Sequence, residues 1–371
     1  MKTEWVHKKL GDDDVAKIIM GQSPSSASYN DENIGLPFLQ GCADFGEVFP
    51  KTSVYCNEPL KVAPQNSILM SVRAPVGTIN KADQKYIIGR GLCSIVSLIN
   101  NDYLYYYLLQ NKNRLEQKAQ GSTFLAINSA EVNDFDVSYP ADLSAQRRIA
   151  AILASADKVI AATQKTIAKY KQIKQGMMED LLNEQCTMNN VQWRKVKLGE
   201  VGDFYVGGDV DRSCFSPYPT VECRFPIYAN ALVNEGLYGF SSKYEFDKEA
   251  ITITGRGDVG KVFYRKPYFS TIIRLVTLIP TDSNIDVKFL SYAMSRINFI
   301  IESTGVPQLT APQAKKYEVS IPYKNGKPDL PAQRRIAAIL SGIDAKIAAE
   351  EKVLEKYEKV KNGLMEKLLN E

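Results

Sequence analysis

The sequence predicts an α+β protein in which two globular blocks are separated by a long antiparallel two-helix coiled coil, with the arrangement duplicated inside the chain. Three observations predict this fold class: a 42-residue segment that occurs twice, a mostly apolar stripe along both copies, and longer segments that mix strand-like and helical runs. The expected boundaries are 1–142 and 187–329 for the two blocks, and 143–186 and 330–371 for the two helical regions.

The repeat is the strongest of these signals. Residues 145–153 are identical to residues 332–340, and 25 of 42 positions agree when 143–184 is aligned on 330–371. The blocks agree far less, although ILMSVRAPVGTI (68–79) matches ITITGRGDVGKV (251–262). Internal self-similarity indicates duplicated structural units. The near-constant helices therefore indicate one shared geometry or partner, and the divergent blocks indicate different targets.

Each helical region carries a stripe that repeats every 3.5 residues, which indicates a coiled coil. A single amphipathic helix cannot bury such a stripe alone, so each helix pairs with the other or with another protein. If an approximate two-fold axis relates the blocks, the two helices run antiparallel. The residues expected in these contacts are Ile149, Leu153, Ile160, Ile167 and Tyr170 in the first copy, and Ile336, Leu340, Ile347, Leu354 and Tyr357 in the second.

Polar residues interrupt both stripes at equivalent places, first at Thr163 and Glu350 and then at Lys174 and Lys361. Asp142 or Ser144 is suited to cap the first helix, and Pro331 suits a first helical turn. Gly176 and Gly363 are poor mid-helix residues, which predicts a bend, a break or a close contact at both positions.

Several loops of the blocks carry side chains that suit nucleic acid. Hydroxyl groups and open backbone N–H groups bind phosphates, whereas Arg, Asn and Gln can make paired hydrogen bonds to base edges. Arg73 and Arg256 stand out because each lies in a turn after a strand, in the best-matched segment of the blocks. An ordinary polar surface turn is the competing interpretation of each loop. The candidate DNA-binding residues are Ser23, Gln40, Ser71, Arg73, Ser122 and Thr123 in the first block, and Asp209, Arg212, Tyr228, Asn230, Thr254, Arg256, Lys261, Thr304 and Gln308 in the second.

Composition and charge exclude several classes of protein. No apolar run reaches the roughly 18 residues of a membrane span, and no apolar stretch follows the N-terminal charges as in a secretory signal. Six cysteines without CxxC spacing suggest reduced thiols in a cytoplasmic protein. The single histidine, His7, excludes a metal site with two His ligands. A net charge of +4 does not by itself identify a nucleic-acid binder.

Signatures of catalysis are missing from the sequence. There is no Walker A motif, and GRGDVG (255–260) fits a dinucleotide fingerprint in letters but lacks a clear βαβ context. Glu116-Gln117-Lys118 offers the E-x-K of a nuclease but no Pro-Asp precedes it, so a solvated helix face is the better interpretation. We therefore expect no catalytic and no metal-binding residues in this chain.

The repeated segments resemble a known family. LSAQRRIAAILASADKVI and LPAQRRIAAILSGIDAKI, with GMMEDLL and GLMEKLL after them, resemble the conserved helical regions of the DNA-specificity (S) subunit of Type I restriction-modification systems. GQSPSSASYNDENIGLPFLQGCADFGE, GGDVDRSCFS and STGVPQLT resemble segments of that family's target-recognition domains. The resemblance covers essentially the whole chain, in two tandem copies.

The resemblance implies a function that composition does not. Two target-recognition domains would lie at opposite ends of an antiparallel spacer, and each would read one half of a bipartite, asymmetric site in double-stranded DNA. The helical regions would hold two methyltransferase (M) subunits, which bring the cofactor S-adenosylmethionine for DNA methylation, and motor-nuclease (R) subunits would join in the full complex. The specificity subunit itself would be non-catalytic and hold no cofactor.

Two other functions stay open at the level of sequence. One is an adaptor that does not bind DNA, with two ligand-binding domains on a coiled-coil scaffold. The other is an enzyme with an unrecognised site between a block and its helix. The first block carries a net charge of −3, which mildly favours the adaptor, whereas the doubled loops and the family resemblance favour DNA.

Overall fold

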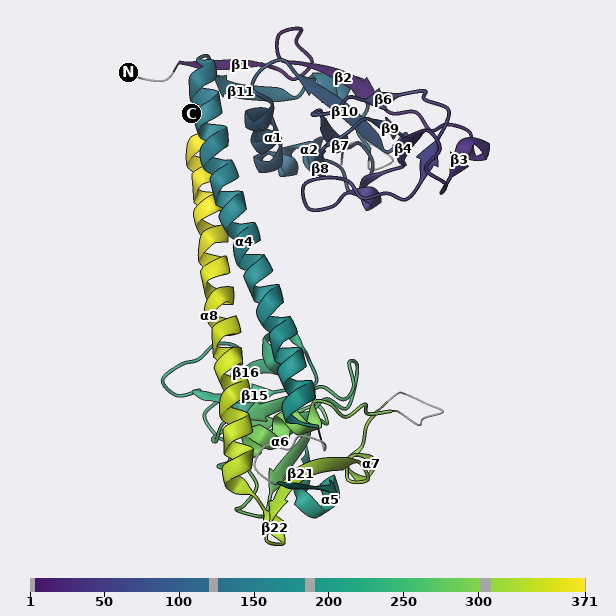
Figure 1. The fold of residues 1–371 in the computed structure, drawn as a ribbon. Helices are drawn as coiled ribbons and strands as arrows, with labels where there is room; N and C mark the ends of the chain where they lie inside the picture. The colour runs from purple at the N-terminus through teal and green to yellow at the C-terminus, as the bar shows by residue number, and fades with distance from the viewer. Residues whose placement is uncertain (1–3, 120–125, 184–190, 301–307, 371) are drawn as a thin grey trace. The chain divides into compact units, whose positions relative to one another are not determined.

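The computed structural model describes residues 4–119, 126–183, 191–300 and 308–370 (Figure 1). The chain divides into two compact units. Unit 1 contains residues 1–165 and 351–371, and unit 2 contains residues 166–350. Each unit thus combines one globular block with part of both long helices, α4 (Leu143–Leu181) and α8 (Leu330–Leu368). The divisions between the units, after residues 165 and 350, fall within the two helical regions and not within a globular block, because each long helix belongs partly to both units.

In the described part of the globular block of unit 1 there are three sheets, each antiparallel or mixed, and three α-helices. The first sheet pairs the two strands that flank the block, β1 and β11, in antiparallel register. Two further sheets follow the orders β2-β10-β7-β8 and β3-β5-β4-β9-β6. The elements are β1 (Trp5–Lys9), β2 (Ala16–Met20), β3 (Tyr29–Asn30), β4 (Leu36–Leu39), β5 (Tyr55–Cys56), β6 (Val62–Ala63), β7 (Ile68–Ser71), β8 (Ile79–Lys81), β9 (Tyr86–Ile88), β10 (Leu92–Ser97), α1 (Asn101–Gln110), α2 (Lys112–Ala119), α3 (Ser129–Asn133) and β11 (Asp136–Pro140).

The block of unit 2 repeats this plan with different side chains. Its sheets follow the orders β12-β21-β22, β13-β20-β17-β18 and β14-β16-β15-β19. Among the named strands of the described residues, one pairing in each block is parallel: β4 with β9 and β15 with β19. The elements are β12 (Gln192–Lys197), α5 (Leu198–Val201), β13 (Gly202–Val206), β14 (Phe215–Ser216), β15 (Phe225–Tyr228), β16 (Leu237–Ser241), β17 (Ala250–Ile253), β18 (Val262–Arg265), β19 (Ser270–Thr271), β20 (Val276–Pro280), α6 (Val287–Met294), α7 (Ala311–Ala314), β21 (Glu318–Lys324) and β22 (Lys327–Pro328).

The same helix caps recur in both units. Asn100 caps α1 and Asp286 caps α6, each accepting from the N–H three residues later, at 2.9 and 2.7 Å. Asn128 and Thr310 head capping boxes at α3 and α7. Asp142 accepts from Ser144 N at 2.9 Å, and Asp329 accepts from Ala332 N at 3.1 Å, so aspartates cap both long helices. These matched caps support duplication of the globular blocks, which the sequence shows only weakly.

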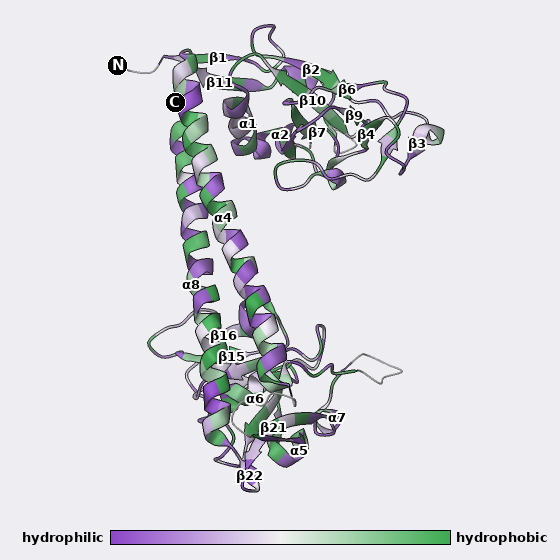
Figure 2. Ribbon diagram, in the orientation of Figure 1, coloured by the Kyte–Doolittle hydropathy of each residue, from purple (hydrophilic) through white to green (hydrophobic). Residues whose placement is uncertain are grey.

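The long helices pack against each other in both units, and the direction is antiparallel. In unit 1, Leu153 near the start of α4 shares a core with Met365 and Leu369 near the end of α8. In unit 2, Leu340 near the start of α8 shares a core with Met177 and Leu181 near the end of α4. In Figure 2 the ribbon colours of hydrophobic and hydrophilic residues alternate along both helices, as expected for a helix that is half covered by a neighbour. The predicted α+β fold with an antiparallel helix pair and an internal repeat is confirmed.

Most residues of the predicted apolar stripes on α4 and α8 are buried or partly buried. Leu153, Ile160, Ile167, Ile336, Leu340 and Ile347 are buried, and Ile149, Tyr170 and Leu354 are partly buried. Tyr357 departs from the prediction because its side chain is 40% exposed. A phenol carries a polar end that is costly to bury without a partner, so this ring suits a half-exposed position. The helix break or close contact predicted at Gly176 and Gly363 is not found. Both helices continue through these glycines, and a Cβ at either position would meet nothing within 4 Å.

A repeated glutamine joins each block to its following helix. Gln146 accepts from Asn100 N at 2.9 Å and donates to the Pro140 carbonyl at 2.8 Å. Gln333 accepts from Asp286 N at 2.9 Å and donates to the Asn284 carbonyl at 3.0 Å. Both side chains are buried, so their amides must be satisfied within the protein. This joint gives a physical reason for the identical AQRR segments.

Other predictions from composition concern thiols and membranes. Cys42, Cys56, Cys93, Cys214 and Cys223 are free thiols, and Cys186 lies outside the described residues. Burial raises the pKa of the Cys93 thiol to about 12, which keeps it protonated and unreactive. Within the part of the chain that the structure describes, no helix combines the length and apolarity needed to cross a bilayer.

Candidate nucleic-acid interface

Three chain segments meet at one end of strand β7 in unit 1. They are the turn at 71–77, the turn at 89–92 after β9, and residues 126–127 before α3. Val72 N donates to the Gly91 carbonyl and Ile127 N donates to the Val72 carbonyl, each at 2.9 Å. Arg73 also forms an isolated β-bridge with Ala126. We call these three segments turn cluster 1.

Unit 2 assembles the equivalent segments, which we call turn cluster 2: residues 254–261 after β17, 272–275 after β19, and 308–309 before α7. Leu309 N donates to the Gly255 carbonyl at 2.9 Å, as Ile127 does to Val72. The side chain of Asn230, from the loop after β15, links two of the segments. It accepts from Gly255 N at 2.7 Å and donates to the Ile273 carbonyl.

A buried hydroxyl shapes the first turn of each cluster. Ser71 Oγ donates to the Pro75 carbonyl at 2.6 Å and accepts from Thr78 N at 2.9 Å. Thr254 Oγ1 donates to the Asp258 carbonyl and accepts from Lys261 N at 2.9 Å. Both residues are only 1% exposed. In this conformation the two hydroxyls hold the turns and do not face solvent, unlike the exposed contacts that the sequence suggested.

The same turns each need one glycine. Gly77 and Gly260 have φ values of 76° and 81°, a left-handed conformation that L side chains rarely adopt. A Cβ at Gly77 would lie 3.0 Å from Leu115 Cβ, and one at Gly260 would lie 2.9 Å from Phe299 Cβ. The repeated glycine is therefore required both by backbone conformation and by space.

The predicted arginines lie at the surface of their clusters. Arg73 is exposed, and its guanidinium makes no hydrogen bond or ion pair with the described residues. Arg256 is half-buried and donates from Nε and Nη2 to Gln308 Oε1 at 3.3 and 3.1 Å. The structure thus brings the two candidates Arg256 and Gln308 together. Since Gln308 is neutral, Arg256 keeps its uncompensated charge.

The remaining candidates of the first block fall into two groups. Ser23 Oγ accepts from Gln40 Nε2 and from Arg90 N, both at 3.2 Å, so these two predicted residues lie beside turn 89–92. Ser122 and Thr123 lie outside the described residues, as does Thr304 of the second block.

Four more candidates of the second block differ in their exposure to solvent. Asp209, Arg212 and Lys261 are exposed. Tyr228 is half-buried, and its ring lies under the guanidinium of Arg265 at 3.7 Å from the ring centroid. Tyr228 is therefore one face of a buried cation–π contact, which limits what else the ring can stack on.

Sequence reasoning missed two exposed arginines in these clusters, Arg90 and Arg274. They occupy equivalent turns, because Gly89 N bonds the Leu39 carbonyl and Ile272 N bonds the Tyr228 carbonyl, at 2.8 and 2.9 Å. Neither guanidinium has a hydrogen-bond or ion-pair partner among the described residues. Ile273 and Arg274 both have positive φ, 53° and 57°, an uncommon conformation for two successive non-glycine residues. An alignment of the two equivalent turns could have identified both arginines, but the two turns have little sequence similarity.

Sequence reasoning also missed a third residue, Arg265, whose buried side chain binds the neighbouring loop that contains Asn234 and Glu235. It is 2% exposed and donates to Thr252 Oγ1 at 2.9 Å and to the Glu235 carbonyl at 2.6 Å. Burial lowers the pKa of this guanidinium, although Glu235 and the Tyr228 ring favour its charge. Asn234 and Glu235 both have positive φ. Arg265 therefore fixes the strained loop that follows Asn230.

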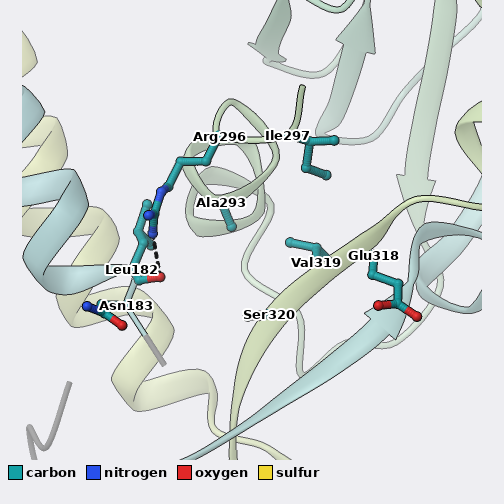
Figure 3. Close-up of a pocket in the computed structure, with 8 residues that line it drawn as sticks. All are labelled: Leu182, Asn183, Ala293, Arg296, Ile297, Glu318, Val319 and Ser320. Carbon is teal, nitrogen blue, oxygen red and sulfur yellow. Dashed lines mark hydrogen bonds between the residues drawn. The ribbon is translucent and has the colours of Figure 1, made fainter. Parts of the chain in front are cut away.

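A pocket of about 400 Å³ in unit 2 is lined by residues outside the turn clusters (Figure 3). Arg296 reaches Leu182 and donates to its carbonyl at 2.6 Å, which satisfies a backbone acceptor just past the end of α4. Glu318 lies on the opposite side of the pocket, and Val319 and Ala293 supply apolar walls. The arrangement is a joint between helix and block. Among the described residues, no group of three or more His, Cys, Asp or Glu side chains could hold a metal ion.

The fold and these clusters define a protein of two matched α+β units, each containing parts of both long helices, with exposed arginines in equivalent turns. The family profile described as the Type I restriction modification DNA specificity domain matches residues 2–173 and again residues 190–359. The two matches cover most of the chain, one in each half of the repeat. The chain belongs to this family.

Individual relatives carry consistent descriptions. The chain is 41% identical over 182 residues to a protein described as the specificity subunit of the type I restriction enzyme MjaX from Methanocaldococcus jannaschii, which covers 48% of this chain and 43% of that protein. A type I specificity subunit from Mycoplasma pneumoniae is 28% identical over 186 residues, covering 46% of this chain and 53% of the relative. The chain thus spans about half the length of these relatives.

Solved structures share the fold over the full length. The S subunit of a Type I restriction-modification system from M. genitalium superposes with a TM-score of 0.70 at 19% identity, covering 100% of this chain and 97% of that one. A chain from structural work on complex assembly and conformational transition of the type I R-M system gives a TM-score of 0.59 at 15% identity, with 100% and 99% coverage.

Proposed function

We propose that this chain is the sequence-specific DNA-binding subunit of a Type I restriction-modification complex, and that each globular block reads one half of a bipartite, asymmetric DNA site. The observation that carries this proposal is the pair of turn clusters. The same backbone frame is built twice, with buried hydroxyls at equivalent places and exposed arginines around them. Arginine suits both phosphate oxygens and the O6/N7 edge of guanine.

Differences between the two clusters support two different half-sites. In cluster 2, Arg256 is held by Gln308, whereas the residue equivalent to Gln308 in cluster 1 is Ala126. In cluster 1, Ser23 and Gln40 lie beside Arg90, whereas in cluster 2 Asn230 links Gly255 and Ile273. Matched frames with unlike side chains are what two readers of different sequences require.

The long helices would set the spacing between the half-sites and dock the methyltransferase subunits. Both helices expose apolar side chains at equivalent positions of the repeat: Ile152 on α4 and Ile339 on α8, then Ile173 on α4 and Val360 on α8. Val159 lies one heptad after Ile152 and is also exposed. An exposed apolar stripe with heptad spacing suits a further helix of a partner protein.

In this proposal the chain acts in the cytoplasm without catalysing a reaction. The methyltransferase subunits would bind S-adenosylmethionine and carry out DNA methylation, and motor-nuclease subunits would add restriction. The role of this chain would be to bind DNA and to position the methyltransferase and motor-nuclease subunits on it.

Gel shifts with the purified chain and its methyltransferase partner test the proposal, with salt stated because phosphate contacts make binding salt-dependent. We expect one bipartite duplex to be bound in preference to random DNA of the same length. A duplex containing only one correct half-site is the matched control, and it should bind more weakly than the full site. Equal binding of bipartite and random duplexes would instead favour the adaptor that does not bind DNA.

A further inference from the structure

The lysine that interrupts the apolar stripe of α8 belongs to a three-residue cluster in unit 1. Asp157 on α4 accepts a hydrogen bond from the Tyr106 hydroxyl of α1 at 2.6 Å and forms an ion pair with Lys361 of α8 at 2.5 Å. The Lys361 ammonium also lies 6.0 Å from the centroid of the Tyr106 ring. One cluster thus joins the globular block to both long helices.

Unit 2 contains the same cluster with the two helices exchanged. Asp344 on α8 accepts from the Tyr292 hydroxyl of α6 at 2.6 Å and pairs with Lys174 of α4 at 2.7 Å. The Lys174 ammonium lies 5.4 Å from the centroid of the Tyr292 ring. The Ser341 hydroxyl, at 3.2 Å from the Tyr292 oxygen, is an addition found in unit 2.

Both clusters are partly shielded from water. The lysine side chains are 22% and 28% exposed, the aspartates 34% and 35%, and both tyrosines are buried. A charged group placed in an apolar helix seam costs stability unless its partner is present, and a polar residue at a single seam position specifies register. Each lysine therefore favours the one pairing that brings its aspartate opposite.

The two ion pairs agree on one register. The interval from Asp157 to Lys174 on α4 equals the interval from Asp344 to Lys361 on α8, so one antiparallel alignment satisfies both pairs. A slip by one heptad would place Lys361 opposite Ala150 or Gln164, neither of which carries a charge. No such slip satisfies both lysines.

We propose that the Tyr106–Asp157–Lys361 and Tyr292–Asp344–Lys174 clusters fix the register of the helix pair and the position of each globular block on its helices. The clusters would thereby determine which spacing between the DNA half-sites is accepted. This inference rests on the proposed function. A one-heptad slip moves a helix by about 10 Å, which corresponds to about three base pairs of duplex. The clusters are positioning residues, since they act through the helices and not by touching DNA.

The test uses the full chain with both lysines changed, Lys174→Met and Lys361→Met, which removes the charges but keeps an unbranched apolar side chain. Lys174→Arg with Lys361→Arg keeps the cations and serves as the conservative variant. Lys359→Met is the matched control, because Lys359 pairs with Glu355 of the same helix at 2.6 Å, with both side chains exposed, and joins no other element.

Two readouts separate the inference from the proposed function. Hydrogen exchange reports the helix pairing of the chain itself, and methylation by the assembled complex is measured on duplexes whose half-sites are separated by successive numbers of base pairs. In the Met variant we expect faster exchange in α4 and α8, and a preference for the wild-type spacing reduced by about fivefold or more, the lower end of typical coupling between sites. The Arg variant and Lys359→Met should behave like wild type.

Wild-type exchange and wild-type spacing preference in the Met variant would overturn the inference while the proposed function stands. A wild-type complex that methylates no bipartite duplex would instead overturn the proposed function and with it the role in spacing, and hydrogen exchange would still decide whether the clusters fix the register. If the Met variant does not fold, loss of the spacing preference in the Arg variant would count against the inference, because that variant keeps both ion pairs.

Discussion

Arginine side chains in the two turn clusters differ in how they are held. Arg73, Arg90 and Arg274 have no hydrogen-bond or ion-pair partner among the described residues, whereas Arg256 is oriented by Gln308. A guanidinium without an anionic partner can bind a phosphate or a base edge without first breaking an ion pair. The buried hydroxyls of Ser71 and Thr254 position the arginines indirectly, because their hydrogen bonds hold the turns that carry Arg73 and Arg256.

Arg256→Ala should weaken binding to the half-site read by the second block and leave the base preference at the other half-site intact. A direct contact of this kind is worth about 1–3 kcal/mol, so a loss of about tenfold is expected in gel shifts with duplexes altered at one half-site. Arg194→Ala is the control, because Arg194 lies on β12 of the same block and stacks on Tyr323. Equal loss of preference at both half-sites would contradict separate reading by the two blocks.

Arg274→Ala should reduce affinity for the same half-site as Arg256→Ala. Among the described residues the exposed guanidinium has no hydrogen-bond or ion-pair partner, so the free energy of unfolding should change by less than about 0.5 kcal/mol. Circular dichroism measures the unfolding, and titration of duplexes with one altered half-site measures the binding. Unchanged affinity for both half-sites would exclude Arg274 from the interface.

At the scale of elements, the two long helices owe their length to tertiary contacts as well as to helix propensity. Aspartate caps, the buried Gln146 and Gln333 joints, and the shared cores at Leu153 and Leu340 hold them to their blocks. The glycines near their ends are tolerated because these contacts compensate for poor propensity.

Leu340→Asp should impair folding of unit 2 and therefore assembly with the methyltransferase subunit. Leu340 is fully buried, and an unpaired charge at such a position typically costs about 3–5 kcal/mol. Ala338→Asp, at an exposed position on the same helix, is the matched control. Size-exclusion chromatography of the mixed subunits measures assembly, and normal complex formation by Leu340→Asp would refute the packing described here.

Gly176→Ala and Gly363→Ala should each stabilise the chain by about 0.5–1 kcal/mol, because a Cβ at either position meets no atom within 4 Å and alanine is the better helix former. Chemical denaturation of the two single variants measures the change. Destabilisation would mean that the glycine serves a bend or a close contact, as the sequence alone had suggested.

For the whole molecule, the duplication and the antiparallel helix pair could be predicted from sequence, because 25 of 42 aligned positions agree and the stripe has a clear period. The stripe also marked Lys174 and Lys361 as exceptions. Their partners could not be predicted, since Tyr106 and Tyr292 come from the divergent blocks and meet the helices only through the fold.

The candidate site was predicted in part. The turns around Arg73 and Arg256 were identified because their segments align, whereas Arg90 and Arg274 were missed because equivalent turns there have unlike sequences, GRG and IIRL. Ser71 and Thr254 were expected as surface contacts, but a hydroxyl that satisfies two backbone groups is buried beneath its turn. Side-chain type indicates what a residue can bind, and only the fold decides what it faces.

Mapping of methylated bases in DNA from cells that express the chain with its methyltransferase partner tests the central claim most directly, because it reports both half-sites and their spacing at once. We expect one bipartite asymmetric motif, with two specified segments separated by a fixed number of unspecified base pairs. In cells expressing the Arg256→Ala variant, only one of the segments should lose definition. A single uninterrupted motif, or no motif that depends on this chain, would contradict the account.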